Sequence, residues 1–196
     1  MFNDLKTALR PALVMTGLLA LLLGLAYPLA LTGMGQLLFP AQANGSLVMQ
    51  DGKAVGSWLI GQSFTSPRYF SGRPSAAGKG YDGMASSGSN LGPTSAALAE
   101  RVTADVARLS ATAPGRPVPS DLVTTSASGL DPHISPEAAL FQVARIAQAR
   151  GLPAAQIRAL VAAVTERPLL GFIGEPRVNL LDLNRRLDLI GAKAKR

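Results

Sequence analysis

The stretch PALVMTGLLALLLGLAYPLAL, residues 11–31, decides how this chain is organised, because residues 12–31 carry no charge. Twenty residues of helix rise about 30 Å, the thickness of the hydrocarbon core of a bilayer. Tyr27 lies near the distal end, where an aromatic side chain suits the membrane interface. Pro28 falls in the last turn and predicts a kink or early fraying. The stretch therefore predicts one transmembrane helix over residues 12–31.

The charges on the two sides of this segment differ. Lys6 and Arg10 precede it, whereas the first cationic residue after it is Lys53. Lysine and arginine are enriched on the cytoplasmic side of membrane helices. We therefore expect residues 1–11 in the cytoplasm and a large domain, residues 46–196, outside it.

A cleaved signal peptide is the alternative interpretation of the same segment. Ala41-Gln42-Ala43 has the A-x-A pattern of a cleavage site. However, the apolar stretch is longer than the 7–15 residues of a typical signal sequence, and the cleavage pattern lies far beyond its end. These two points favour a retained anchor, followed by a linker over residues 32–45.

The chain that follows the apolar segment has the composition of an ordinary globular protein. Of 196 residues, 47% are hydrophobic and 16% are charged, with a net charge of +7 and no cysteine. Removing the first forty leaves about 155 residues, enough for one core. Basic charge can indicate a nucleic-acid partner, but here it is spread out, without a basic-aromatic cluster or a binding motif. No nucleic acid is expected, and the absence of cysteine excludes disulfides and thiolate metal sites.

The outer domain contains short extended segments and a long irregular one. Extended segments are predicted at 47–50, 53–55, 58–64 and 122–125. Asp51-Gly52 between the first two predicts a β-hairpin, because this pair tolerates the positive φ values of a tight turn. Residues 65–95 are rich in Gly, Ser and Pro, and so long a connection is either functional or disordered.

Helices are predicted by apolar periodicity and by terminal signals. They begin near Ser95, Ser135, Pro153 and Asn179. Ser135 with Pro136 is a typical N-cap followed by proline in the first turn, and Gly151 is a typical C-terminal stop. The sequence thus predicts a mixed α+β extracytoplasmic domain behind one N-terminal transmembrane helix.

The sequence gives little indication of a catalytic site. His133 is the only histidine, and a triad with Asp131 and a nearby serine would need a nucleophile elbow, G-x-S-x-G, which is absent. Asp131-Pro132-His133 better predicts a turn leading into a helix, with the aspartate bonded to its own backbone. Acidic residues are scattered and no glycine-rich run fits a P-loop. No catalytic residue and no metal ligand is predicted.

Four sequence blocks nevertheless occur in order behind the anchor. They are YFSGRP (69–74), SGSNLGPT (87–94), SASGLDPHISP (126–136) and GEPRVNLL (174–181). With these blocks in register, the chain resembles the KdpC family, the C subunits of bacterial Kdp potassium-transporting ATPases. The resemblance covers essentially the full length.

The resemblance implies a non-catalytic subunit of a complex in the bacterial inner membrane. Its partners would be a potassium-channel-like subunit (KdpA), a P-type ATPase subunit (KdpB), a small single-helix subunit (KdpF) and the lipid bilayer. The family is described as a catalytic chaperone that raises the ATP affinity of the ATPase subunit. The chain would hold no cofactor of its own, and ATP would be bound only in a ternary complex.

Candidate contact residues lie in two Gly/Ser blocks and in the anchor. The candidates for ligand or partner contacts are Ser87, Gly88, Asn90, Gly92, Ser126, Ser128, Gly129, Asp131 and His133. Small residues allow close helix packing in membranes, so Gly17, Ala20 and Gly24 are candidates for a helix–helix contact. The charge bias places the Gly/Ser blocks outside, whereas ATP is cytoplasmic. We therefore expect any effect on ATP use to pass through the anchor.

Two other functions remain open from sequence. One is a membrane-anchored extracytoplasmic binding or assembly module unrelated to potassium. The other is an anchored hydrolase that uses a serine and His133, which predicts that His133→Ala abolishes an activity of the outer domain.

Overall fold

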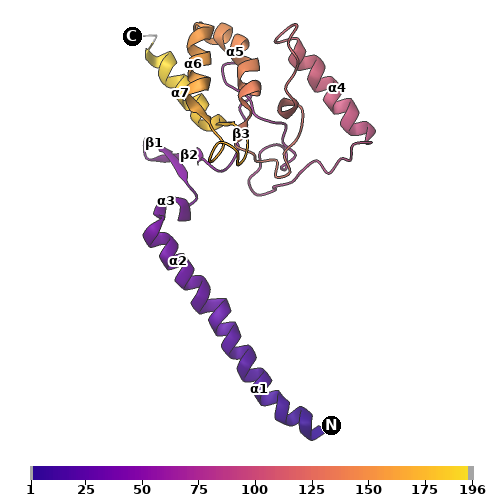
Figure 1. The fold of residues 1–196 in the computed structure, drawn as a ribbon, viewed down its shortest axis with the longest axis vertical. Helices are drawn as coiled ribbons and strands as arrows, with labels where there is room; N and C mark the ends of the chain where they lie inside the picture. Colours follow the sequence, from indigo (N-terminus) through magenta and orange to yellow (C-terminus); the bar gives the residue numbers. More distant parts are fainter. Residues whose placement is uncertain (1, 194–196) are drawn as a thin grey trace. The chain divides into compact units, whose positions relative to one another are not determined.

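The structure is a computed structural model that describes residues 2–193, with side chains described for residues 6–191. The chain divides into two compact units, Met1–Leu47 and Val48–Arg196. The first is helical, and the second combines helices with short strands (Figure 1). The predicted mixed α+β class with one N-terminal apolar helix is confirmed.

The first unit is built on one long helical segment. It comprises α1 (Phe2–Leu21), the π-helical η1 (Leu22–Ala26), α2 (Tyr27–Leu38) and a short α3 (Pro40–Ala43). The apolar part, Lys6–Leu38, is 33 residues long, and none of its most apolar window is buried within the chain. It is long and apolar enough to cross a membrane. Residues 32–45, the predicted linker, are mostly helical.

Pro28 explains the π-helical turn. Proline lacks an N–H, and its ring clashes with the carbonyl group four residues earlier in a regular helix. Leu22–Ala26 wind more widely, and the N–H of Tyr27 donates to the carbonyl of Leu22, five residues back. The extra residue in this turn relieves the clash. The helix therefore continues through Pro28 to Leu38, and the predicted fraying does not occur.

The second unit begins with the predicted β-hairpin. Strands β1 (Leu47–Gln50) and β2 (Lys53–Ser57) pair with each other. Asp51 and Gly52 have φ of 50° and 76°, the positive values that the turn requires. Residues 58–64 do not form a strand: Trp58 and Leu59 turn back, and only a single bridge joins Ser57 to Ile60.

The four predicted helices are all present. They are α4 (Ala96–Ser110), α5 (Pro136–Arg150), α6 (Ala154–Val164) and α7 (Leu180–Lys193). Ser135 Oγ accepts from the N–H of Ala138 at 3.0 Å and Gly151 has φ of 65°, as the terminal signals predict. Asn179 Oδ1 accepts from the N–H of Asp182 at 3.2 Å.

The strand predicted at 122–125 is wrong. Ser120–Leu122 form a 3-10 turn, η2. The carbonyl of Ser120 accepts from both the N–H and the hydroxyl of Thr124, at 2.9 Å and 2.8 Å. These local bonds compete with extended structure, as threonine side chains often do.

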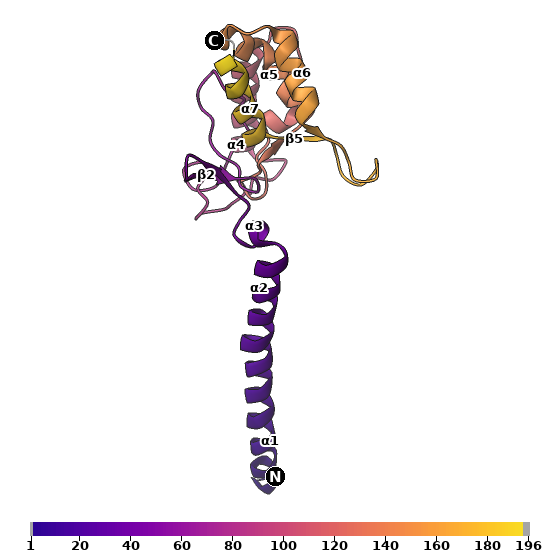
Figure 2. The ribbon, with the colours of Figure 1, turned by 90° about the vertical axis from the view of Figure 1, so that its left-hand side faces the viewer.

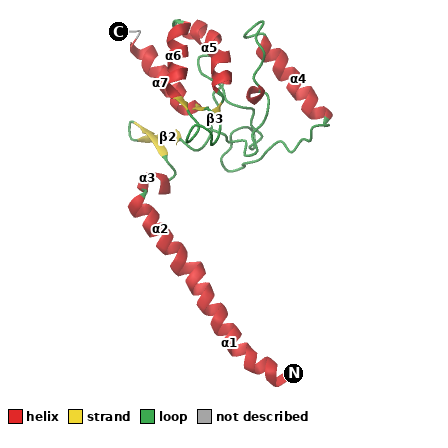
Figure 3. Ribbon diagram, in the orientation of Figure 1, coloured by secondary structure: helices red, strands yellow, loops and turns green. Residues whose placement is uncertain are grey.

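A three-stranded sheet was not predicted. Its strands are β3 (His133–Ile134), which is labelled in Figure 3, β4 (Thr165–Glu166) and β5 (Arg177–Asn179). They pair antiparallel in the order β3-β5-β4. His133 pairs with Asn179, and Thr165 pairs with Val178. Strands of two or three residues are too short to give a periodic pattern.

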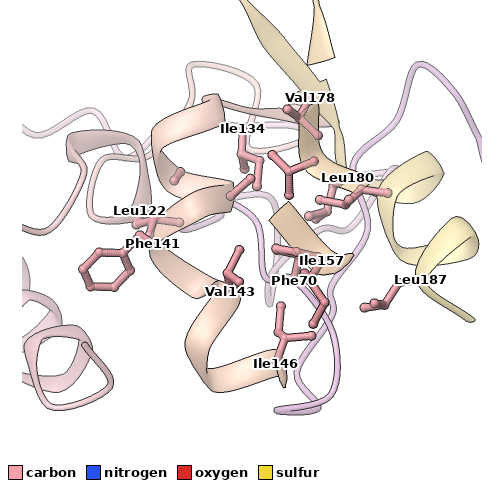
Figure 4. Close-up of a cluster of buried hydrophobic side chains, with 14 of the residues drawn as sticks. Phe70, Leu122, Ile134, Phe141, Val143, Ile146, Ile157, Val178, Leu180 and Leu187 are labelled. Carbon is pink, nitrogen blue, oxygen red and sulfur yellow. The ribbon is translucent and has the colours of Figure 1, made fainter. Parts of the chain in front are cut away.

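The core lies among α5, α6, α7 and this sheet (Figure 4). Its largest fully buried apolar side chains are Phe70, Phe141, Ile146, Ile157, Leu180, Leu183, Leu187, Val143, Val161 and Val178. Phe70 belongs to the long irregular segment, and its side chain has no exposed area. Residues 65–95 are therefore a packed part of the domain, at least at this point, and not a plain linker.

Candidate functional site

The two Gly/Ser blocks lie against each other. The N–H of Ser87 and the hydroxyl of Ser86 both donate to the carbonyl of Ser128, at 3.0 Å each. Gly88 lies beside the backbone of Ala127, where an added Cβ would be 3.0 Å from its carbonyl oxygen. Blocks about forty residues apart in sequence thus form one compact loop structure. Whether they contact a ligand or a partner stays a prediction.

Gly129 is needed at the centre of this structure. Its φ is 66°, and an added Cβ would lie 2.6 Å from the carbonyl oxygen of Ser87 and 2.7 Å from the nitrogen of Ala77. Its carbonyl accepts from Ser75 Oγ at 2.6 Å. Ser126 is buried and accepts through its carbonyl from the N–H of Gly129. The hydrogen bonds of Gly129 and Ser126 described here therefore stabilise the loop structure itself.

Asn90 and Gly92 are not drawn into the packed blocks. Both are exposed. Asn90 has φ of 53°, a conformation that asparagine tolerates better than most residues. The carbonyl of Gly92 accepts from the N–H of Ser95 at 3.0 Å, just before α4 begins.

Asp131, in the block 126–136, bonds to Arg73 of the block 69–74. Its Oδ2 accepts from Arg73 Nη1 at 3.0 Å, and its Oδ1 accepts from the N–H of His133 at 3.0 Å. The second bond is the predicted turn of an aspartate bonded to its own backbone. His133 Nδ1 lies 3.7 Å from Oδ1, longer than an ordinary hydrogen bond.

The surroundings of Asp131 favour its charged form. Burial by itself acts to raise the pKa of this carboxyl group. The side chain and the backbone N–H of His133, together with Arg73, outweigh burial and lower the pKa from 3.8 to about 2. Asp131 is therefore a carboxylate throughout the physiological range and cannot act as a general acid there.

Tyr81 forms a hydrogen bond with the backbone of Arg73. Its hydroxyl donates to the carbonyl of Arg73 at 2.6 Å. Burial, and then the negative charge of Asp131, raise the pKa of the Tyr81 phenol to about 12, although Arg73 opposes them. The sequence places Arg73 and Tyr81 in the glycine-rich segment without giving either a role. Only the cation within the YFSGRP block could have drawn attention to Arg73.

The Arg73–Asp131–His133 group lies at an open pocket of about 790 Å³. The other walls come from η2, from the start of α5, and from the chain between β4 and β5 together with the first residue of β5; they include Asp121, Ser135, Arg167, Glu175 and Arg177. Three acidic and three arginine side chains thus alternate with apolar ones. Such mixed walls suit a polar peptide segment better than a strongly charged small ligand.

The pocket lacks the features of a phosphate or nucleophile site. At the N-terminus of α5, Ser135 Oγ is the cap, and Asp121 Oδ2 accepts from the N–H of Ser135 at 2.8 Å. A carboxylate there would repel a nucleotide phosphate, so these residues do not fit ATP. Ser128 Oγ accepts from the N–H of Leu130, again a structural use. Among the described residues, no group of His, Asp or Glu side chains could hold a metal ion.

The anchor residues present an open face. Gly17 and Ala20 lie in α1 and Gly24 in the π-helical turn, and all three are exposed. An added Cβ at Gly17 or Gly24 would meet nothing within 4 Å. The space for a second helix is therefore present, and the contact itself stays a prediction.

Comparison with known proteins identifies the family. The family model described as KdpC, the c chain of K+-transporting ATPase, matches residues 9–189. The chain belongs to the KdpC family. This confirms the resemblance that the four sequence blocks indicate.

Individual KdpC relatives match over nearly their whole length. The chain is 62% identical to the potassium-transporting ATPase KdpC subunit of Methylobacterium nodulans, covering 94% of this chain and 98% of the relative. It is 61% identical to that of Caulobacter vibrioides, covering 92% of each. It is 59% identical to that of Gemmatimonas aurantiaca, covering 94% of each.

Three of the four blocks that carry the KdpC resemblance meet at the pocket. Arg73 belongs to the first block, Asp131 and His133 to the third, and Glu175 and Arg177 to the fourth. Segments up to a hundred residues apart thus supply one surface. For a KdpC chain, this pocket is the best candidate for contact with another molecule.

Proposed function

We propose that this chain is a non-catalytic accessory subunit of an ATP-driven potassium-uptake complex in the bacterial inner membrane. The observation that carries the proposal is a KdpC-family chain whose 33-residue apolar helix is left uncovered by the rest of the chain. A membrane helix of this kind associates through small residues and close packing. The charges around Lys6 and Arg10 favour a cytoplasmic N-terminus and an outer domain in the periplasm or extracellular space.

The partners are a channel-like KdpA subunit, a P-type ATPase subunit KdpB and a small KdpF subunit. The face with Gly17, Ala20 and Gly24 packs against a partner helix, and the pocket beside Arg73 and Asp131 receives an extracytoplasmic loop of the channel-like subunit. These assignments rest on small side chains in the helix and on the mixed charges of the pocket. Together they stabilise the assembled complex.

The chain raises the ATP affinity of the ATPase subunit without binding ATP in its outer domain. With the outer domain outside, only the first residues and the anchor reach the compartment that holds ATP. The start of α5, with Asp121 beside the Ser135 cap, also disfavours phosphate. The effect therefore acts through helix contacts in a ternary complex.

A pair of anchor variants tests this route. Gly17→Leu with Gly24→Leu keeps the segment apolar but fills the open face. We expect it to weaken assembly, to reduce potassium-stimulated ATPase activity and to raise the KM for ATP of what still assembles. Leu19→Phe, on the opposite face of α1, is the control and should change none of the three.

Two outcomes would contradict the proposal. The first is normal assembly and ATP affinity in the double variant. The second is specific labelling of the outer domain by azido-ATP at physiological ATP concentration, in a complex oriented with that domain outside.

A further inference from the structure

A narrow arm projects from the second unit between β4 and β5. The arm, residues 167–176, leaves the helices and returns to the sheet (Figure 2). Near its tip, the N–H of Leu169 donates to the carbonyl of Ile173 at 3.1 Å, and the reverse bond is 2.9 Å. The arm is thus a hydrogen-bonded hairpin tip and not a loose loop.

The tip of the arm is apolar and largely exposed, although Leu169 and Ile173 also line the pocket beside Arg73. Leu169 is 68% exposed, Leu170 75%, Phe172 77% and Ile173 51%. Single exposed apolar residues are normal in proteins, but four at one projecting turn form a patch. The core gains little from them, so their role lies outside the folded unit.

The backbone at the tip supports the same conclusion. Leu170 has φ of 55° and is followed by Gly171 with φ of 81°. Two-residue turns with both φ positive favour asparagine or aspartate before glycine, and leucine is costly there. Leu170 recovers little of this cost by packing within the described chain, because three-quarters of it is exposed.

We propose that the tip of the arm inserts into the interfacial layer of the membrane that holds the anchor. The inference uses the membrane anchor but does not depend on the subunit role. Lipid can surround a narrow turn and cover its apolar side chains on every side, whereas a flat protein surface would cover only one side of the turn. Leucine, phenylalanine and isoleucine are residue types that such interfacial segments bury.

Tether length and charge agree with a lipid partner. Only residues 39–46 separate α2 from β1, and eight residues span at most about 28 Å. The start of β1 therefore lies within about 28 Å of the end of α2. Residues 166–177 contain two glutamates and two arginines. A neutral arm gains little from anionic lipid, so insertion depends on apolar burial, with the Arg167 stem and its charge at the headgroups.

Fluorescence quenching in liposomes tests the insertion. The full chain, carrying Trp58→Phe and Phe172→Trp, is reconstituted alone into phosphatidylcholine vesicles with or without brominated acyl chains. We expect blue-shifted emission and clear quenching by the brominated lipid. The control carries Met84→Trp in the same background, at a side chain that is 96% exposed. It should emit as a solvent-exposed indole without quenching.

A second change keeps the fold while removing the apolar side chain. Leu170→Asn suits the positive φ, so thermal unfolding should not be lowered, yet quenching of the Phe172→Trp chain should fall. The proposal is overturned if the Phe172→Trp chain behaves like the Met84→Trp control. It is equally overturned if its emission shifts to blue only when other Kdp subunits are added, since that would assign the arm to a protein partner. Neither result depends on whether the chain supports potassium transport.

Discussion

Asp131 holds Arg73 and the backbone of His133 at the edge of the pocket through its two carboxylate oxygens, and an asparagine at this position keeps only one acceptor oxygen. Asp131→Asn should therefore destabilise the outer domain by about 1 to 2 kcal/mol at pH 7, the lower figure reflecting partial exposure. Urea unfolding of the full chain in mild detergent, followed by Trp58 fluorescence, measures this difference.

The same substitution predicts a pH dependence. The folded-state pKa of Asp131 lies below its ordinary value of 3.8, at about 2. Its stabilisation is therefore complete above about pH 4 and is lost as the pH falls toward 2. The difference between wild type and Asp131→Asn should shrink over this window. A difference that stays constant down to pH 2 would contradict the assigned pKa.

Gly129 and Gly151 separate two costs of replacing a glycine. Their φ values are 66° and 65°, but an added Cβ meets backbone atoms at Gly129 and nothing within 4 Å at Gly151. Gly151→Ala should cost about 1 kcal/mol for the backbone conformation alone. Gly129→Ala should cost about 3 kcal/mol or more, because the two blocks must separate. Equal costs in urea unfolding would show that the close approach of the blocks is not needed.

Single residues were predictable where their partners are local. The Ser135 cap, the Gly151 stop and the Asp131 turn depend on atoms within three or four residues. Arg73 and Tyr81 were not assigned, because Arg73 meets Asp131 across 58 residues of sequence. Sequence patterns for turns and helix ends involve only neighbouring residues, so they do not predict a pair 58 residues apart.

Among the elements, α7 fixes the start of the long irregular segment. Asn184 is 1% exposed, and its amide group bonds both the N–H and the carbonyl of Phe70, each at 2.9 Å. Asn184→Ala leaves both backbone groups buried without partners and should cost about 3 kcal/mol. It should also speed hydrogen exchange around Phe70.

Arg186→Ala is the matched control on the same helix. Arg186 makes only an exposed ion pair with Asp182 one turn away, at 2.9 Å, and such pairs contribute about 0.5 kcal/mol. Its removal should leave exchange around Phe70 unchanged. Similar effects of the two substitutions would mean that α7, and not the Asn184 clamp, orders the segment.

Elements with long periodic patterns were predicted, and short ones were not. The helices α4 to α7 follow from apolar spacing and caps, and the hairpin follows from Asp51-Gly52. The sheet β3-β5-β4 has strands of two or three residues, so pairing between distant segments decides it. The segment 122–125 contains β-branched residues, but Leu122 ends the 3-10 turn η2 and Thr124 bonds back to the carbonyl of Ser120.

For the whole molecule, composition alone separated an apolar N-terminal segment from a globular remainder. Four sequence blocks in register indicated the family. The pocket was not predictable, because its walls come from three of those blocks and only the fold brings them together. The membrane span predicted over residues 12–31 stays a prediction, and the helix that contains it continues to Leu38 because the π-helical turn accommodates Pro28.

Co-purification from native membranes tests the central claim most directly. The full chain, tagged at its C-terminus and expressed from its own locus under potassium limitation, is extracted in mild detergent and captured. We predict that two much larger membrane proteins, the channel-like and ATPase subunits, co-purify with it and that the eluate has potassium-stimulated ATPase activity. Capture of the chain alone, from membranes that contain both larger subunits, would contradict the account.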